Sequence, residues 1–182
     1  SARADRIREL LTQKKKFSVE DFCTMQLDLY DLRARDVLPD LIKILRESKD
    51  KEVQLASELL DEWDCYASKE SRGACLYYPF LDRFWQRKYM YRVLKDDLIK
   101  LLPLGAPGLN RFDINSFMNP RGPWKDHEEL LKATIQEEMK TVVDRVKLSL
   151  GNDCSKWRWG NLHQIEFWHS LNNYPSWKKF KI

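Results

Sequence analysis

The residues best suited to chemistry lie near the carboxyl end of the chain, where His163, Glu166 and His169 follow one another at three-residue steps. On a helix these side chains would lie near one face and could hold a metal ion. However, Gly160 argues against a regular helix, and a structural zinc needs a fourth ligand, for which only Cys154 is nearby. Aromatic residues crowd the same stretch, at Trp157, Trp159, Phe167 and Trp168. The default interpretation is hydrogen-bonded histidines in an aromatic cluster, and no metal or other cofactor is expected in this segment.

Cysteine chemistry is a second possibility, and it would need a thiolate, a base and an orienting group brought together in space. The four cysteines are Cys23, Cys65, Cys75 and Cys154, and none forms a CxxC pair. They allow three complete disulfide pairings, among which sequence alone does not choose. Cys65 and Cys75 are close enough in sequence to bridge a short loop in an oxidising compartment. Cys23 lies among helix-interior positions and is expected to be a small buried hydrophobe.

Ser1 suggests a third chemistry, because the free α-amine of an N-terminal serine can activate its own hydroxyl as a nucleophile. An α-amine has a pKa of about 7.7–8.0, so it acts as a base near neutral pH. The alternative is that Ser1 only marks where a cloned or excised piece of a longer precursor begins. Ser1 is followed by Ala-Arg-Ala, and this context favours the alternative.

The composition is typical of a folded protein whose surface is rich in charged residues. Of the 182 residues, 43% are hydrophobic and 12% aromatic, which is enough for a sizeable core, and a single domain over residues 1–182 is expected. The 32 basic and 28 acidic residues are interspersed, with a net charge of +4. Nucleic-acid binders concentrate their charge on one face, so no nucleic-acid partner is expected. No apolar run approaches the roughly 18 residues of a membrane span.

Helical signals start at Ser18, where a hydroxyl precedes Asp21 at the spacing of a capping box. Phe17 and Phe22 have the spacing of a hydrophobic staple around that cap. From there one apolar face is predicted to continue through Phe22, Met25, Leu29 and Leu32. The same periodicity predicts further helices over 37–45, 53–63, 71–88, 94–101 and 126–151.

Prolines and glycines divide these helices. Pro39 is expected in the first turn of its helix, where proline is tolerated, whereas Pro79 should kink or split the helix that contains it. A Pro- and Gly-rich connection occupies residues 103–124, and such long loops tend to be functional or to wrap over a surface. Asp126 with Glu129 offers a second capping pair, and Gly151 is a natural C-terminal stop. The predicted fold class is mainly α, an irregular orthogonal multi-helix domain.

Four ordered segments resemble the large post-cleavage chain of the penicillin acylase family, which includes cephalosporin and acyl-homoserine-lactone acylases. They are Arg-Ala-Asp-Arg-Ile at 3–7, Ser-Val-Glu-Asp-Phe at 18–22 with Met-Gln-Leu-Asp at 25–28, Leu-Leu-Asp-Glu-Trp-Asp at 59–64, and Trp-Arg-Trp-Gly-Asn-Leu-His at 157–163. The last segment is the most specific. Its Trp157, Trp159, Gly160 and His163, and Trp63 with Asp64 in the third, are interpreted as structural, because buried indoles and a satisfied imidazole can lock a loop.

The resemblance implies a nucleophile elsewhere. The family's catalytic chain begins Ser-Asn-x-Trp, and its Arg-Ala-x-Arg-Ile segment lies well inside that chain, so Ser1 is not expected to be the nucleophile. The oxyanion-stabilising Asn is expected outside this sequence as well. A family arginine that orders the α-amine matches Arg3 best, with Arg6 as the competing assignment. Of the active site, only this supporting arginine is expected here.

By the same resemblance, the parent protein hydrolyses a linear amide and this piece alone is inactive. Its implied partners are the rest of the same precursor, namely a nucleophile-bearing sheet and a small α chain, together with a small-molecule amide substrate. An extracytoplasmic location is in keeping with the resemblance. The competing hypothesis is a self-contained, non-enzymatic helical module that binds a partner protein through exposed aromatic residues.

Overall fold

The computed structural model of the chain describes residues 2–82, 85–93 and 125–165, and in these ranges the regular structure is helical. The β structure among them is one isolated antiparallel bridge, between Tyr30 and Tyr66. The helices are α1 (Ala2–Thr12), α2 (Val19–Gln26), α3 (Leu32–Arg46), α4 (Lys51–Asp61), α5 (Ala74–Asp82), α6 (Trp85–Val93), α9 (Glu128–Leu150) and α10 (Trp159–Leu162), with short 3-10 turns at Lys125–His127 and Cys154–Lys156. The mainly-α fold class is confirmed.

Several predicted features lie outside the described residues. These are Ser1, the helix expected over 94–101, the connection at 103–124, and Glu166 and His169 of the candidate metal cluster. Among the helices that are described, none is long and apolar enough to cross a membrane.

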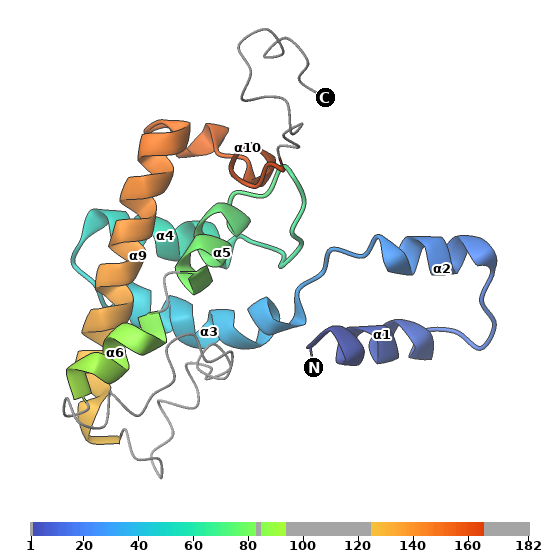
Figure 1. Cartoon of the computed structure of the whole chain (residues 1–182), viewed down its shortest axis with the longest axis horizontal. Coiled ribbons are helices and arrows are strands. Elements are labelled where there is room, and N and C mark those ends of the chain that lie inside the picture. The colour runs from blue at the N-terminus through green and yellow to red at the C-terminus, as the bar shows by residue number, and fades with distance from the viewer. Residues whose placement is uncertain (1, 83–84, 94–124, 166–182) are drawn as a thin grey trace, which may run out of the picture.

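The core lies where α9 packs against α3, α4, α5 and α6. We call these five helices the body. Figure 1 shows α9 running across α3 and α4 instead of alongside them, as expected for an irregular helical domain. α9 buries Leu131, Ile135, Met139, Val142 and Val146 at helical spacing, as its sequence periodicity predicts. At the rim of this apolar contact, Lys140 pairs with Asp50 and Lys147 pairs with Glu52, which tie α9 to α4.

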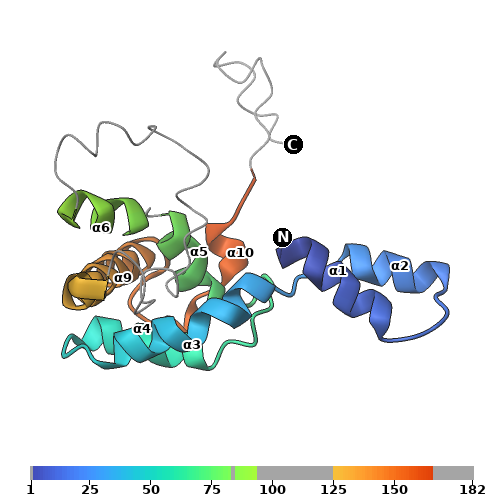
Figure 2. The same cartoon turned by 90° about the horizontal axis from the view of Figure 1, so that it is seen from below.

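The first two helices form a hairpin that extends away from the body in both views (Figures 1 and 2). Ser18 caps α2 with a complete capping box: its hydroxyl accepts from the backbone N–H of Asp21, whose carboxylate accepts from the N–H of Ser18. The Phe17 and Phe22 rings lie 5.8 Å apart, so the predicted staple is also confirmed. The single apolar face predicted from Phe22 to Leu32 is wrong, because α2 ends at Gln26 and a new helix starts at Leu32.

Pro39 lies in the middle of α3 and not in its first turn, which corrects the prediction. The helix starts earlier because Asp31 caps it, its Oδ1 accepting from the N–H groups of Arg33 and Ala34 at 2.9 and 3.0 Å. An interior proline costs a helix about 3 kcal/mol, since it removes a hydrogen bond to the carbonyl four residues earlier. Burial of eight α3 residues in the body offsets that cost.

Two further helix predictions need correction. The helix expected over 71–88 is two helices, α5 and α6, so the predicted split is present, but it does not fall at Pro79, which lies inside α5. The predicted cap at Asp126 is wrong, since α9 begins after His127, which makes no side-chain cap hydrogen bond, and a 3-10 turn precedes it. Gly151 does end α9, with a φ of 89° that favours glycine and an N–H that donates to Lys147 at 2.8 Å.

Candidate functional site

The Trp-x-Trp-Gly-x-x-His segment closes over α5 and the end of α9. Trp157 is fully buried in the core, and its Nε1 donates to the carbonyl of Gly151 at 2.9 Å. Trp159 begins α10 and stacks on the His163 ring, with centroids 4.8 Å apart and planes within 7°. The Trp159 ring also packs on Tyr78 of α5, with ring centroids 5.0 Å apart. Trp157 therefore anchors the segment in the core, and Trp159 stacks on the exposed His163.

Gly160 lets this segment approach the loop after α4. The N–H of Gly160 donates to the carbonyl of Lys69 at 2.9 Å, and that of Trp159 donates to Ser71 at 3.0 Å. A Cβ on Gly160 would lie 2.9 Å from the Cβ of Lys69, so a side chain would push the loop away. Gly160 lies within α10, a single turn that ends at Leu162, before His163, and close packing is what requires a glycine there.

The Trp63–Asp64 pair makes a tight turn at the start of the same loop. The Nε1 of Trp63 donates to the carbonyl of Tyr66 at 2.9 Å, and the Asp64 carboxylate accepts from the N–H of Tyr66 at 3.0 Å. Between them Cys65 has a φ of 63°, a conformation that costs a non-glycine residue energy. The Trp63 side chain packs directly against Gly73, and a Cβ added to Gly73 would lie 2.4 Å from the Cβ of Trp63.

Arg6 of α1 binds the segment that joins the hairpin to α3. Its Nε and Nη2 donate to the two carboxylate oxygens of Asp28 at 2.8 and 3.1 Å, a bidentate geometry that aligns both groups. The guanidinium also lies over the Tyr30 ring, 4.5 Å from the centroid. The hydrogen bond from Arg6 lowers the pKa of Asp28 below its usual range, so the carboxylate is charged at neutral pH.

Tyr30 and Asp31 continue the contacts into the body. The Tyr30 and Tyr66 rings lie 4.9 Å apart beside their backbone bridge, and the N–H of Asp31 donates to Cys65 at 2.9 Å. The hydroxyl of Tyr78 donates to Asp31 Oδ2 at 3.0 Å. Burial raises the pKa of Tyr78, and the negative charge of Asp31 raises it further, so this phenol is neutral at physiological pH.

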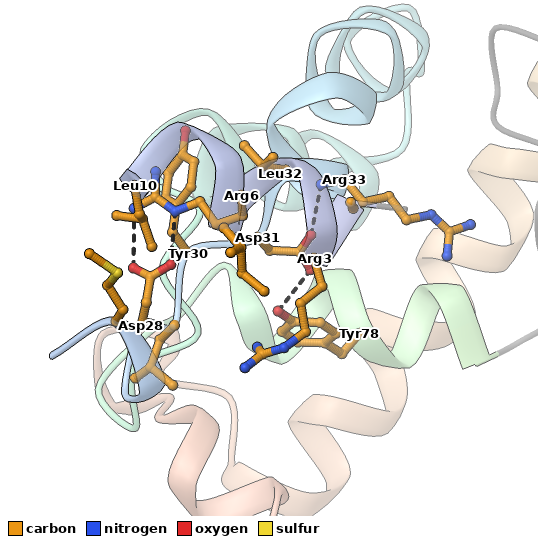
Figure 3. Close-up of a pocket in the computed structure, with 13 residues that line it drawn as sticks. Arg3, Arg6, Leu10, Asp28, Tyr30, Asp31, Leu32, Arg33 and Tyr78 are labelled. Carbon is orange, nitrogen blue, oxygen red and sulfur yellow. Dashed lines mark hydrogen bonds and ion pairs between the residues drawn. The ribbon is translucent and has the colours of Figure 1, made fainter. Parts of the chain in front are cut away.

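These contacts enclose a pocket of about 350 Å³ between α1, the segment after α2 and the start of α3. Figure 3 shows Arg3, Arg6, Asp28, Tyr30, Asp31 and Tyr78 on its walls. Apolar residues complete the lining, among them Ile7, Leu10, Met25 and Leu29. Pockets of this size are at the low end of those that hold small molecules.

The two candidate arginines differ within this pocket. Arg6 is committed to Asp28 and Tyr30, whereas Arg3 is exposed and has no ion pair among the residues that the structure describes. Arg3 nevertheless lies near enough for its charge to lower the pKa of Asp28. Arg6 therefore has a fixed position, and Arg3 is the one with its guanidinium available to another group.

Among the residues that the structure describes, no three metal-ligating side chains gather, and His163 stacks on Trp159. Glu166 and His169 of the candidate metal cluster lie outside that part of the chain. All four cysteines are free thiols. Cys23 is exposed, so the expectation of a buried hydrophobe is wrong: it lies on the projecting hairpin, where no core covers it. Burial raises the pKa of Cys75 to about 11, which makes its thiol a poor nucleophile.

What sequence reasoning missed is the cluster around Asp28, Tyr30, Asp31 and Tyr78. A signal was present, since Asp31 precedes the apolar stripe of α3 as an N-cap residue would. The cluster matters because it joins the distant segments singled out from the sequence: Arg6 contacts Tyr30, Tyr30 contacts Tyr66, Trp63 contacts Tyr78, and Tyr78 contacts Trp159.

The geometry thus unites four segments whose order and spacing resemble one family of hydrolases. A comparison with family models bears this out, because the model described as Penicillin amidase matches residues 1–181. The match spans the hairpin, the body and the Trp-x-Trp-Gly-x-x-His segment, and so includes all the residues whose contacts are described above. We conclude that the chain belongs to the penicillin amidase family.

Proposed function

We propose that the chain is a helical segment of an amidohydrolase that cleaves linear amides with an N-terminal serine carried by another part of the same precursor. Family membership supports a hydrolase, and the observation that carries the finer proposal is the role in the structure of residues from the four segments that resemble the family. Trp63, Trp157 and Gly160 are occupied in packing, and Arg6 is occupied in an ion pair. These residues build a scaffold, and the reacting groups belong elsewhere.

In the proposed reaction the serine hydroxyl attacks the amide carbonyl while the serine's own α-amine accepts the proton. The amine of the substrate leaves, an acyl-enzyme forms, and water then releases the acid. An oxyanion hole stabilises the tetrahedral intermediates, and loss of one donor from such a hole typically costs about 3 kcal/mol. No cofactor is required from this segment.

Arg3 is the residue of this chain that we propose to support that site. Its exposed side chain lines the pocket, and Arg6, which lines the same pocket, is paired with Asp28. A free positive charge beside an N-terminal amine disfavours the ammonium form, which keeps more of the amine available as a base. Arg3 is then a positioning residue, acting through the amine of the nucleophile.

The test compares this chain with the product of the complete reading frame that encodes it. The chain alone should not hydrolyse phenylacetyl or fatty-acyl para-nitroanilides, whereas the complete product should release the coloured para-nitroaniline. A Ser-Asn-x-Trp sequence some hundreds of residues upstream of Arg3 is expected in that reading frame. Turnover by the chain alone, or a reading frame without the upstream serine, would contradict the proposal.

A helical protein-interaction module is the second candidate, and the hairpin favours it. Neither α1 nor α2 has a buried residue, and Val19, Phe22 and Leu27 are exposed. Exposed apolar groups in this density mark surfaces that bind other proteins. The complete reading frame separates the two candidates, since a module would need neither the upstream serine nor any amide turnover.

A further inference from the structure

The α1–α2 hairpin is built like a part that needs a partner. α1 has 11 residues and α2 has 8, and helices of this length are marginal in water unless tertiary packing supports them. Both helices lack a buried residue, whereas α3 and α9 bury eight each. α1 packs on α3, and side chains of α1 and α2 line a common space, which leaves most of the surface of both helices uncovered.

One side of this surface can be located from helix geometry. Leu10 on α1 and Asp21 on α2 line the space of about 170 Å³ between the helices, and so point toward each other's helix. The next residues, Leu11 and Phe22, lie 100° further round. Because the two helices are antiparallel, this step turns both side chains to the same side of the hairpin.

Four exposed apolar side chains lie on that side. Ile7 and Leu11 lie one turn apart on α1, and Val19 and Phe22 lie one turn apart on α2. All four are exposed, Val19 to 74% and Phe22 to 49%. We call Ile7, Leu11, Val19 and Phe22 the docking face.

The two ends of the docking face carry positive charge. Arg3 is one turn before Ile7 and continues the same row of α1. At the tip of the hairpin, Lys15 and Lys16 are exposed, and neither has an ion-pair partner in the described part of the chain. Lys14, by contrast, pairs with Asp21 at 2.5 Å. A partner that fits is therefore apolar in the middle and offers carboxylates or other acceptors at both ends.

We infer that the docking face is the surface on which the nucleophile-bearing part of the same amidohydrolase packs, an inference that rests on the function proposed above. Arg3 is continuous with the docking face, so the partner that covers Ile7 and Leu11 also reaches Arg3 and the pocket behind it. Packing there brings the reacting groups to the arginine and supplies the apolar cover that α1 and α2 lack.

Hydrogen exchange tests this surface. In the chain alone, amides of α1 and α2 should exchange at least tenfold faster than those of α9, at every protein concentration. In the complete product of the reading frame, the same hairpin amides should be slowed by at least tenfold. A complete product that hydrolyses amides but leaves the hairpin amides fast overturns the docking face alone. A product without amide turnover overturns the proposed function, and this inference with it.

A pair of variants makes the test specific. Phe22→Glu places a charge within the docking face, and Leu148→Glu places one at an apolar residue of α9 that is 88% exposed. In the complete product, Phe22→Glu should remove the slowing of hairpin exchange and Leu148→Glu should leave it unchanged. Equal effects overturn the inference. So does slowing in the chain alone that rises with concentration, which indicates a second copy, or slowing on phosphatidylglycerol vesicles only, which indicates a lipid surface.

Discussion

The hairpin and the body of this chain follow the same local rules and reach opposite outcomes. α2 has a complete capping box and a hydrophobic staple, while α3 contains an interior proline. By local signals alone α2 should be the firmer helix. Yet α3 buries eight residues and α2 buries none. Tertiary packing therefore decides which helix is stable, and caps decide mainly where each helix starts.

The comparison also separates two meanings of an apolar stripe. In α9 the stripe of Leu131, Ile135 and Met139 is fully buried within this chain. In the hairpin the stripe of Ile7 and Leu11 is exposed. The sequence pattern is the same in both. It indicates that one face of the helix will be covered, but it does not indicate which part of the protein covers that face.

The largest difference should appear when an aromatic side chain is removed from each region. Trp157→Ala removes a fully buried indole and its hydrogen bond to Gly151, and should lower the free energy of unfolding by about 3–5 kcal/mol. Phe22→Ala in the hairpin should change it by less than about 0.5 kcal/mol. Urea unfolding followed by tryptophan fluorescence and circular dichroism measures both. A large loss from Phe22→Ala would mean that the hairpin and the body unfold as one unit.

A smaller loss is expected where a glycine sits against a buried side chain. Gly73→Ala would place a Cβ 2.4 Å from that of Trp63, and the strain of overpacking should cost about 2–3 kcal/mol. Gly160→Ala is the milder case for comparison, because its added Cβ would lie 2.9 Å from the Cβ of the exposed Lys69 and 3.4 Å from the Lys69 carbonyl oxygen. It should cost about 1 kcal/mol. If the order of the two unfolding midpoints were reversed, the packing of Trp63 against Gly73 would not be limiting.

These glycines show how far the sequence could be read. Helix positions, the Ser18 cap and the Gly151 stop follow from local spacing, and local spacing is present in the sequence. The role of Gly160 depends on Lys69, about ninety residues earlier, and no local rule reports such a distant approach. Pro39 is a different case, because its interior place follows from the start of α3 at the Asp31 cap, and that cap is a local signal.

The candidate site was predictable in part. Arg3, Arg6, Trp63 and Trp157 were identified by resemblance, and the structure connects the segments that contain them. The partners that fix Arg6, namely Asp28 and Tyr30, were missed. Each lies more than twenty residues away in sequence, and a bidentate ion pair leaves no periodic signal. Cys23 shows the converse error, since helix-interior spacing predicts burial only where a core exists to bury it.

Loss of the Arg6 pair should loosen the hairpin and spare the body. The side chains of Arg6 and Asp28 are 17% and 15% exposed, and Arg6→Gln should lower the local stability of the hairpin by about 1 kcal/mol. The body's unfolding midpoint should not change. Hydrogen exchange of α1 and α2 amides, with α9 amides as the internal reference, measures the difference. Arg8→Gln, which removes an exposed pair with Asp5, should have no resolvable effect.

The same pair sets a pH dependence with a defined sign. The hydrogen bond from Arg6 lowers the pKa of Asp28 in the folded chain, so the stabilisation is fully present above the ordinary aspartate pKa of about 3.9. It is lost as the pH falls through the lowered value. Hairpin protection, corrected for intrinsic exchange rates, should therefore be constant from about pH 5 to 8 and decrease below about pH 4. Arg6→Gln should flatten that dependence, and a slope that survives the substitution would point to another carboxylate.

The smallest effect concerns the caps, where the chemistry of the two regions can be matched. Asp50 caps α4 in the body and Ser18 caps α2 in the hairpin, and loss of either cap is worth about 1 kcal/mol to its own helix. Asp50→Ala should lower the free energy of unfolding of the body by that amount. Asp50→Asn, which keeps a cap but loses the charge paired with Lys140, isolates the contribution of the cap. Ser18→Ala should leave the unfolding midpoint unchanged and only speed exchange within α2, because a helix that no core holds contributes little to the cooperative transition. A midpoint shift for Ser18→Ala equal to that for Asp50→Ala would show that the hairpin is coupled to the body more tightly than its exposed surface indicates.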